Sequence, residues 1–262
     1  MHSEVNISFI GAGNVAWHLA VAMEAAGYQV KEVYSRTIDH ATALADKLYN
    51  ATPTQLLDFT GSKASVFIIA VPDDKVAQIT PKVVLPENAI VVHTSGSIPL
   101  EALQNHPHTG VFYPLQTFSK HKKLNVGEVP FCIEASDEAT ENILVEMAQQ
   151  ISHTVYLVSS AERKILHLGA VFACNFTNHL LGIARNILDR EDLEFDLLKP
   201  LILETINKGL HAEHPASVQT GPAIRNDQQI IDNHLDYLSP YPAEANIYRI
   251  LTESIRHTQK KV

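Results

Sequence analysis

Two glycines near the start of the chain are spaced to hold the phosphates of a dinucleotide. The sequence GAGNVA at 11–16 follows the short apolar run 7–10 and leads into an apolar helical pattern. Gly11 permits a tight turn, Gly13 lets the backbone approach a pyrophosphate, and the small side chain of Ala16 lets the helix pack on the strand. A strand, a glycine turn and a helix in this order predict the first half of a dinucleotide-binding βαβ unit.

The helix that follows the glycine turn should add its own phosphate contacts. Its first residues, Asn14 and Val15, lie where main-chain N–H groups lack a helical partner and where the helix dipole is positive. We therefore predict that Gly11, Gly13, Asn14 and Val15 bind the cofactor. A glycine turn in an unliganded α/β fold is the alternative, since GxGxxA alone is a weak signal, but its place between strand and helix favours binding.

The end of the second predicted strand decides which nucleotide is bound. NAD sites usually place an Asp or Glu about 20 residues beyond the glycines, where it holds the ribose hydroxyls. Here the sequence reads Ser35-Arg36-Thr37, with no carboxylate. Arg36 can pair with a 2′-phosphate and stack on adenine, and the Ser35 and Thr37 hydroxyls can donate hydrogen bonds. The turn predicts NADP(H) in preference to NAD(H); a surface arginine on an ordinary turn is the alternative.

Two further strand ends should line the same crevice, because ligands of open α/β sheets bind at the carboxyl ends of the strands. The first, at 71–73, should cover the ribose or nicotinamide, with Pro72 fixing the loop. The second, at 94–96, carries hydroxyls and a glycine that would let the nicotinamide approach, although an ordinary turn explains it about as well. We predict cofactor contacts from both strand ends, namely from Val71, Pro72, Asp73, Thr94, Ser95 and Gly96.

Strand and helix patterns alternate through the first part of the chain. The run Val66–Val71 is continuously apolar, as expected for a strand that helices cover on both faces. This alternation predicts an α/β fold with a doubly wound, mostly parallel Rossmann sheet. The other expected strands are 7–10, 28–34, 49–51, 89–92, 109–115, 130–135 and 154–158, and the expected helices are 14–26, 39–48 and 138–151, with another starting at 72–74.

The character of the sequence changes at about Ser159. Residues 161–188 contain no proline and are apolar almost all round, which predicts one long helix that forms the buried spine of a helical domain. We therefore divide the chain into an NADP-binding Rossmann domain, 1–158, and an all-helical substrate and dimerisation domain, 159–262. Further helices are predicted at 193–210, 226–238 and 242–257.

The long predicted helix carries a polar stripe that could act on a substrate. At about 100° per residue, His167, Asn175 and Asn178 fall within a wedge of roughly 80° on one face. His167 could donate a proton to a carbonyl or imine, and Asn175 could orient the substrate. Buried polar groups need partners, so the alternative is a hydrogen-bond network at the domain interface.

One arginine near the end of the chain could bind the substrate. Arg225 lies in the irregular segment 214–227, and it could hold a substrate carboxylate if this loop folds back on the cleft. Pairing with Asp227 is the alternative. His211 and His214 lack a third ligand and a helix that would align them, so no metal site is predicted.

The composition is that of an ordinary globular protein, with 45% hydrophobic and 19% charged residues among 262. A net charge of −9 argues against a nucleic-acid or anionic-membrane surface. Cys132 and Cys174 are expected to be small core residues in a reducing compartment rather than a disulfide. The chain shows no room for a signal peptide before the first strand and no apolar run long enough to span a bilayer, so a cytoplasmic location is expected.

Several motifs carry a resemblance to known families. On GAGNVA, the Ser-Arg-Thr turn and AVPDD, the first half is similar to the NADP-binding domain of pyrroline-5-carboxylate reductase, of the deazaflavin-dependent NADP oxidoreductases, and of the 6-phosphogluconate and β-hydroxyacid dehydrogenases. The whole chain resembles a family of Rossmann-like oxidoreductases with a helical C-terminal domain of unknown function. The matching pieces are HTSGS at 93–97, YPLQTF at 113–118, ERKILHLGAVFACNFTNHLL at 162–181 and TGPAIRND at 220–227.

The resemblance implies a function and an assembly. It implies a C-terminal domain like that of 6-phosphogluconate dehydrogenase, a homodimer formed through it, and hydride transfer between NADP(H) and a small carbonyl, hydroxy-acid or imine substrate held between the domains. Tyr113, where the family is expected to have His, and Gln116 should lie beside that substrate. The Lys and Asn that β-hydroxyacid dehydrogenases are expected to carry one turn apart on the equivalent helix do not occur here. The alternative is a non-catalytic NADP(H)-binding sensor or regulatory protein.

Overall fold

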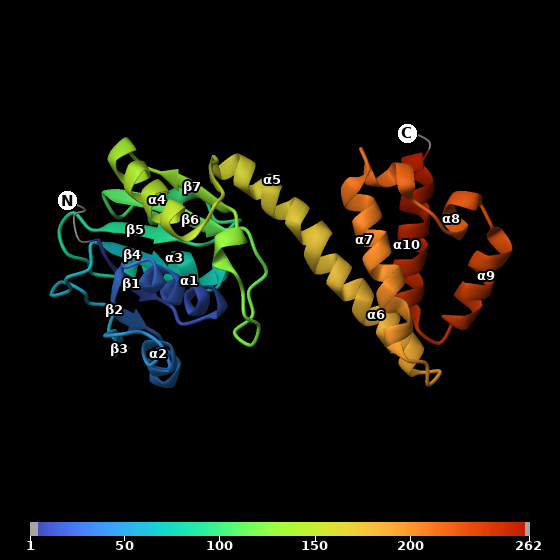
Figure 1. The fold of residues 1–262 in the computed structure, drawn as a ribbon, viewed down its shortest axis with the longest axis horizontal. Helices are drawn as coiled ribbons and strands as arrows, with labels where there is room; N and C mark the ends of the chain where they lie inside the picture. Colours follow the sequence, from blue (N-terminus) through green and yellow to red (C-terminus); the bar gives the residue numbers. More distant parts are fainter. Residues whose placement is uncertain (1–4, 260–262) are drawn as a thin grey trace. The chain divides into compact units, whose positions relative to one another are not determined.

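The structure is a computed structural model that describes residues 5–259. The chain divides into two compact units, Met1–Cys174 and Asn175–Val262 (Figure 1). This division falls within the long helical stretch, whereas the change in sequence character lies at Ser159. The first unit therefore contains the sheet together with helix α5 (Ser160–Ala170).

An eight-stranded sheet forms the first unit, in the order β3-β2-β1-β4-β5-β6-β7-β8. Neighbouring strands are parallel except for β6 and β7, which are antiparallel. Since β1 lies between β2 and β4, the strand order reverses there, as in a doubly wound Rossmann sheet. The predicted fold class is confirmed. The strands are β1 (Asn6–Ile10), β2 (Gln29–Tyr34), β3 (Thr52–Thr54), β4 (Val66–Ile69), β5 (Ile90–His93), β6 (His108–Pro114), β7 (Phe131–Ala135) and β8 (Val155–Leu157).

The central strands are apolar on both faces because helices cover both faces. In β4 every residue is buried, and its alternate side chains enter two separate cores, Val66 and Ile68 on one side, Phe67 and Ile69 on the other. Helices α1 (Asn14–Ala25), α2 (Ile38–Ala45) and α4 (Glu138–Ile151) contribute to the first core and α3 (Asp73–Ile79) to the second. A pleated strand sends successive side chains to opposite faces, so a continuous apolar run satisfies both cores at once.

The third strand lies later than predicted. A strand was expected at 49–51, but β3 spans Thr52–Thr54. Helix α2 ends at Ala45, and residues 46–51 return the chain to the sheet. Pro53 is tolerated within β3 because this strand forms the edge of the sheet, where a missing N–H breaks no ladder.

The predicted long helix is present but is neither uniform nor buried. Helix α5 is followed by a π-helical turn, Val171–Phe176, and then by α6 (Thr177–Asp189). In the single chain the side chains of Ile165 and Leu168 are 70% and 52% exposed, so the expected buried spine is wrong for one copy of the chain. A π turn also adds about one residue to a turn and rotates all later positions, so the polar stripe predicted with α-helical phase does not continue past it.

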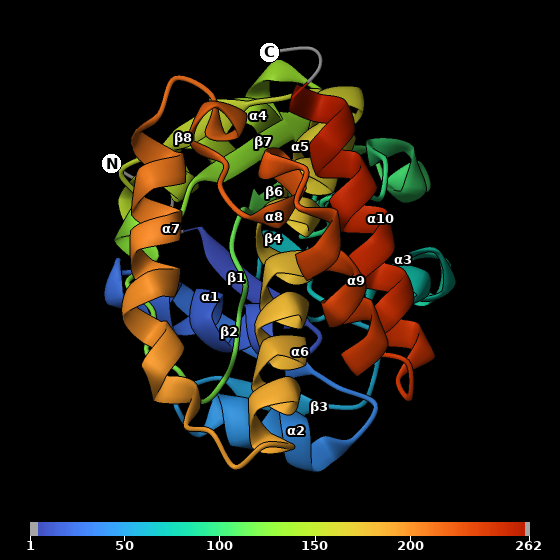
Figure 2. The same ribbon diagram turned by 90° about the vertical axis from the view of Figure 1, so that its right-hand side faces the viewer.

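The second unit is a group of helices in which Ala223, Ile231, Leu238 and Ala245 are buried. Helix α8 (Pro222–Arg225) packs against α10 (Pro242–Gln259) and against α9 (Gln228–Tyr237), as Figure 2 shows. Arg190 joins the end of α6 to α10 through two bonds to Glu244, of 2.8 and 2.7 Å, and its guanidinium lies 3.5 Å from the centroid of the Tyr241 ring. The second unit also contains α7 (Lys199–His211).

Two expectations from composition can be compared with the structure. None of the helices within the described residues is both long and apolar enough to cross a bilayer. Both cysteines are free: Cys132 is buried, as expected, whereas Cys174 is exposed, because it lies in the π-helical turn and not in a packed core.

Candidate functional site

The glycine turn after β1 can be formed only by glycine at its first position. Gly11 has φ +121°, and a Cβ added there would lie 2.2 Å from the carbonyl oxygen of Ala70. Its N–H donates to the Tyr34 carbonyl at 2.9 Å. The turn is therefore held between the ends of β2 and β4, where the strand order reverses.

The start of α1 is available to an anion. Gly13 is the N-cap and has no side chain to occupy the first N–H groups of the helix, and the first turn contains no acidic residue. Ala16 is fully buried against the sheet, so the helix packs closely, as its small side chain predicted. Unpaired amides and the positive end of a helix dipole are a common phosphate-binding arrangement.

A cavity of about 620 Å³ opens at this end of the sheet. We call it the phosphate pocket. Its walls come from the glycine turn, the end of β2, α2, the end of β4, α3 and the segment after β6. Seven of the predicted cofactor residues line it, namely Gly11, Gly13, Asn14, Ser35, Arg36, Val71 and Pro72.

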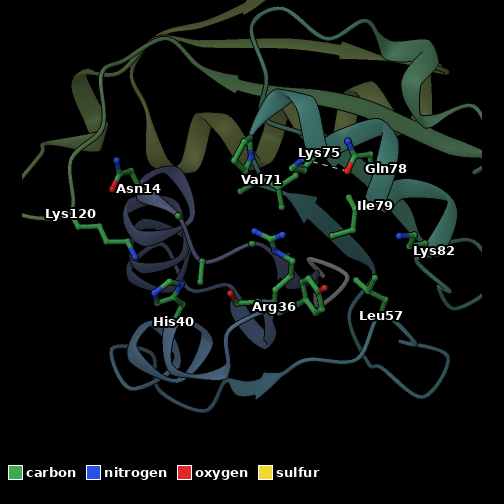
Figure 3. Close-up of a pocket in the computed structure, with 17 residues that line it drawn as sticks. Asn14, Arg36, His40, Leu57, Val71, Lys75, Gln78, Ile79, Lys82 and Lys120 are labelled. Atoms are coloured by element: carbon green, nitrogen blue, oxygen red, sulfur yellow. Dashed lines mark hydrogen bonds between the residues drawn. The ribbon is translucent and has the colours of Figure 1, made fainter.

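The phosphate pocket is basic although the protein is acidic overall. Arg36, His40, Lys75, Lys82 and Lys120 line it, while none of the described residues in its walls is an Asp or Glu. The net charge of the chain is −9, so this lining departs from the average surface. Figure 3 shows the Arg36 guanidinium extending into the pocket between the glycine turn and α3. Clustered cations in a concave site attract a phosphorylated ligand.

Several residues that line the phosphate pocket were not predicted from the sequence. His40, Lys75 and Lys82 lie on helices whose neighbours gave no signal of a ligand. Lys120 belongs to the basic run KHKK at 120–123, which could have been noticed but which the net charge obscured. Leu57 and Ile79 add apolar surface facing Arg36, as a flat aromatic ring would need (Figure 3).

The turn after β2 offers hydroxyls and a cation without a competing acid. The Ser35 hydroxyl accepts a hydrogen bond from the Thr37 N–H at 3.3 Å, which orders the turn around Arg36. The carboxylate of Glu32, within β2, accepts from the Ser62 hydroxyl at 2.7 Å and from Ser8. Glu32 is therefore engaged inside the sheet and does not replace the missing ribose-binding acid.

The strand end after β5 has a different construction. Ser95 is buried, and its hydroxyl accepts from the N–H groups of Ser97 and Ile98 at 3.1 and 3.0 Å. The Ser97 hydroxyl donates to the carboxylate of Asp73 at the start of α3. The predicted contacts Asp73, Thr94, Ser95 and Gly96 form this loop and its anchor, and they do not line the phosphate pocket; Val15 and Thr37 lie beside the pocket but outside its walls.

A fully buried arginine holds the loop after β5 against α5. Arg163 donates from Nη1 to the carbonyls of Ser95 and Ile98 at 3.2 and 2.8 Å, and more weakly to that of Gly96 at 3.4 Å. Its Nη2 donates to the Glu134 carboxylate at 2.8 Å and to the Ser160 hydroxyl at 2.9 Å. Nothing in the sequence pattern distinguished Arg163 from a surface residue of a helix.

One turn after Arg163, His167 meets Tyr113. The Tyr113 hydroxyl lies 3.1 Å from His167 Nδ1, and Tyr113 is 8% exposed. Burial raises the pKa of Tyr113 to about 12, so the phenol stays protonated at neutral pH and can donate to Nδ1. In that arrangement the remaining proton of a neutral imidazole is on Nε2. Gly96 leaves room for this pair, because a Cβ there would lie 2.7 Å from His167 Nδ1.

The last residue of β5 is a buried histidine. His93 is 0% exposed, and its Nδ1 accepts from the Ser95 N–H at 3.2 Å. Burial, assisted by the positive charge of Arg163, lowers the pKa of His93 to about 4. The side chain is therefore neutral near pH 7 and serves as an acceptor for the loop.

Three other predicted site residues are exposed. Gln116 is exposed, and its side-chain oxygen accepts from the Thr117 N–H at 2.7 Å. Asn175 is exposed in the π-helical turn, where the second unit begins, and Arg225 is exposed in α8 of that unit. Asp227 caps α9 by accepting from the Ile230 N–H at 3.3 Å. Among the described residues, no group of three His, Cys, Asp or Glu side chains could hold a metal ion.

Comparison with known proteins places this geometry in a family. Residues 2–117 match a Rossmann-like domain, and residues 129–255 match DUF2520, a domain of unknown function. The putative NADP oxidoreductase BF3122 from Bacteroides fragilis is 42% identical, covers 97% of this chain and 98% of its own, and superposes with a TM-score of 0.90. The chain belongs to this family of Rossmann-like proteins with a DUF2520 C-terminal domain. No curated protein sequence matches it significantly.

More distant solved structures share the fold. A pyrroline-5-carboxylate reductase from Coxiella burnetii is 18% identical with a TM-score of 0.56, covering 97% of this chain and 99% of its own. The imine reductase from Myxococcus stipitatus, in complex with NADP+, is 12% identical with a TM-score of 0.63, covering 98% of this chain and 94% of its own.

Proposed function

We propose that the protein is an NADP(H)-dependent oxidoreductase that transfers hydride between the nicotinamide and a small carbonyl, hydroxy-acid or imine substrate. The observation that carries the proposal is the phosphate pocket, in which a glycine turn at the start of α1 faces Arg36 and other cations with no acid among the described lining residues. The description of the 42% identical relative as a putative NADP oxidoreductase supports the same activity.

The lining of the phosphate pocket fits a phosphorylated dinucleotide along its length. The N–H groups at the start of α1 suit the pyrophosphate, Arg36 and Ser35 suit a 2′-phosphate, and Leu57 and Ile79 suit the adenine ring. Bound NADP(H) would supply the hydride donor or acceptor. We expect this preference for the 2′-phosphorylated cofactor because Arg36 stands where an NAD site would have a carboxylate.

In this proposal the protein itself supplies a proton to the substrate, from His167. Tyr113 holds His167 by its Nδ1, which fixes the ring and leaves Nε2 as the nitrogen that can exchange a proton with a substrate. We propose that the imidazolium form of His167 donates its Nε2 proton to the substrate oxygen or nitrogen on reduction and becomes a neutral ring whose remaining proton, on Nδ1, bonds to the Tyr113 oxygen; on oxidation the neutral ring accepts a proton at Nε2. Arg163 lies one helical turn before His167 on α5 and donates to carbonyls of the loop after β5. It therefore positions His167 by fastening α5 to that loop.

Binding experiments test the cofactor half of the proposal. NADPH and NADH are titrated into the wild type, into Arg36→Ala, and into Lys63→Ala, a charge-matched control that lies before β4, near the amino ends of the central strands. Loss of a charge-assisted contact of about 1.5–3 kcal/mol should weaken NADPH binding about 10- to 100-fold in Arg36→Ala. NADH binding, and both cofactors with Lys63→Ala, should be nearly unchanged. Equal affinity of the wild type for NADPH and NADH would contradict the preference.

A non-catalytic NADP(H) sensor is the second candidate, because it would use the same pocket. Purified protein is incubated with NADPH and a panel of ketoacids, semialdehydes and cyclic imines. Turnover that is lost in His167→Gln, with NADPH binding retained, supports the enzyme. Tight NADPH binding without turnover of any compound supports the sensor.

We also propose that the second unit pairs with a second copy of the chain. Helix α7 has no buried residue, and Leu203, Ile206 and Leu210, which share one face, are 64%, 44% and 77% exposed. Such a stripe is typical of a helix that packs on a partner, and a self-complementary contact would close as a dimer. Light scattering should give twice the mass of 28.9 kDa, and Leu203→Ser with Leu210→Ser should lower it toward one copy.

A further inference from the structure

The segment that follows β6 is fastened to α1, the helix that carries the glycine turn. His18 Nε2 lies 2.8 Å from the Ser119 carbonyl oxygen, and the rings of His18 and Phe118 are 5.6 Å apart. The ammonium of Lys120 lies 4.8 Å from the centroid of the Trp17 ring. These contacts come from successive residues of the segment and from neighbouring residues of α1, so they fix where Lys120 can reach.

Lys120 lies at the border of two hollows. It lines the phosphate pocket, and it also lines a neighbouring groove of about 700 Å³ that contains the rest of the basic run at 121–123. Lys47 has its ammonium at the same 4.8 Å from the Trp17 ring. Two ammonium groups beside one ring gain a cation–π attraction but repel each other, so an anion that one of them can reach is favoured there.

Three basic side chains line one end of the phosphate pocket, and each comes from a different element. Arg36 follows β2, His40 lies in the first turn of α2, and Lys120 follows β6. Figure 3 shows the Lys120 side chain extending toward His40, with Arg36 on the other side of His40. This end therefore has basic groups on opposing walls.

We propose that Lys120 determines cofactor specificity by binding the 2′-phosphate of the cofactor from the wall opposite Arg36. This inference rests on the proposed NADP(H) function and adds a residue outside the turn after β2. A phosphomonoester can accept from several donors at once, so Arg36 and Lys120 need not compete. NADP(H) would thereby tie the segment after β6 to the pocket, whereas NAD(H), which lacks this phosphate, would leave Lys120 on Trp17.

The tie has a consequence for the pair that moves the proton. Tyr113 is the next-to-last residue of β6, which ends at Pro114, and it precedes Lys120 by seven residues. Phosphate binding at Lys120 should therefore restrict the backbone between Pro114 and Lys120. Amide hydrogen exchange of residues 115–121 reports this restriction without any substrate.

The test compares Lys120→Ala with Lys122→Ala, which removes the same charge from the same segment but lines only the neighbouring groove. Dissociation constants are measured for NADPH, NADH, 2′,5′-ADP and 5′-AMP, with thermal melting of each variant as the check on folding. Lys120→Ala should weaken NADPH and 2′,5′-ADP about 3- to 10-fold and change NADH and 5′-AMP by less than about 2-fold. Lys122→Ala should change none of the four by more than about 2-fold, and Lys120→Arg should retain the preference.

Hydrogen exchange gives the second readout. In the wild type, NADPH should slow exchange in residues 115–121 more than saturating NADH does, and Lys120→Ala should abolish the difference. Equal protection by the two cofactors would overturn the proposed tie. Equal losses in Lys120→Ala and Lys122→Ala would overturn the specific contact in favour of a general positive field. If the wild type prefers NADPH and Lys120→Ala keeps the full preference, this inference fails while the proposed function stands; if the wild type shows no preference, the NADP(H) proposal itself fails.

Discussion

The phosphate pocket and the Tyr113–His167 pair both lie at the carboxyl ends of strands, yet they are built in opposite ways. Arg36 is exposed and the Lys75 side chain is 40% exposed, whereas Arg163 is 0% and Tyr113 8% exposed. The cations that line the pocket make contacts at the surface, such as the 2.8 Å ion pair of Lys75 with Asp74, so these residues should set affinity and hardly affect folding. The Tyr113–His167 pair is held by hydrogen bonds, including those of buried Arg163, that exist before any ligand binds. Substitution of the residues that make these bonds should therefore lower stability, and it should lower activity by displacing the pair.

The largest expected effect lies at Arg163. Arg163→Met removes the buried donor of the Ser95 and Ile98 carbonyls, and it removes the ion-pair partner of Glu134, which keeps its hydrogen bonds from Ser160. Removing one partner of a buried ion pair lowers the free energy of unfolding by about 3–5 kcal/mol. Urea unfolding measures this loss. The neighbouring exposed residue provides the control, since Lys164→Met should change stability by less than about 0.5 kcal/mol; a loss of the same size in both variants would show that the buried bonds contribute little.

The next effect depends on pH and involves His93. Its pKa of about 4 in the folded protein lies below the ordinary 6.5, so between these values the unfolded chain binds a proton that the folded chain does not. Stability from this group is complete above pH 6.5 and is lost as pH falls toward 4, by about 3 kcal/mol in all. The slope of unfolding free energy against pH should therefore be smaller in His93→Asn than in the wild type, and equal slopes in the two proteins would contradict this account of His93.

A smaller effect is expected from filling the space beside the pair. In Gly96→Ala the new methyl group would lie 2.7 Å from His167 Nδ1 and 2.8 Å from the Tyr113 hydroxyl. Overpacking of this kind lowers stability by about 1–3 kcal/mol. Gly169→Ala is the control because, among the described residues, no atom beyond its chain neighbours and the backbone of its own helix lies within 4 Å of the added Cβ, and it should stabilise α5. Calorimetric melting separates the two, and an unchanged melting temperature in Gly96→Ala would mean that the pair moves freely.

The phosphate pocket was easier to predict from the sequence than the Tyr113–His167 pair. The glycine turn and Arg36 were predicted because a βαβ unit is local: a strand, a turn and a helix follow one another, and the position of Arg36 at the next strand end follows from chain direction alone. Lys120 was missed because its place depends on the path of an irregular segment over α1, which no periodicity encodes. The helix boundaries of α4 were predicted exactly as found, since Asp137 caps it and its apolar period is regular.

For the Tyr113–His167 pair, the sequence indicated both residues but not their contact. His167 was predicted from a polar helical stripe, and Tyr113 from a motif. Their contact brings together β6 and α5, and the two residues are 54 positions apart in the sequence, so no local pattern predicts it. Asn175 was added to the stripe on α-helical phase, and the π-helical turn at Val171–Phe176 invalidates that phase. Arg163 gave no signal at all, because an arginine between a glutamate and a lysine has the pattern of a solvated helix face.

The smallest effect should come from a single hydroxyl in the phosphate pocket. Ser35→Ala removes one hydroxyl that can donate to the 2′-phosphate, a neutral contribution of about 0.5–1.5 kcal/mol. NADPH should bind about 2- to 10-fold more weakly while NADH affinity stays the same, so the same variant supplies its own control. Its unfolding free energy should match that of the wild type within about 0.5 kcal/mol, because the Ser35 hydroxyl makes one exposed bond, from the Thr37 N–H, within the part of the chain that the structure describes. A loss of stability as large as the loss of NADPH affinity would contradict the distinction between the phosphate pocket, which should set affinity, and the Tyr113–His167 pair, whose bonds should set stability.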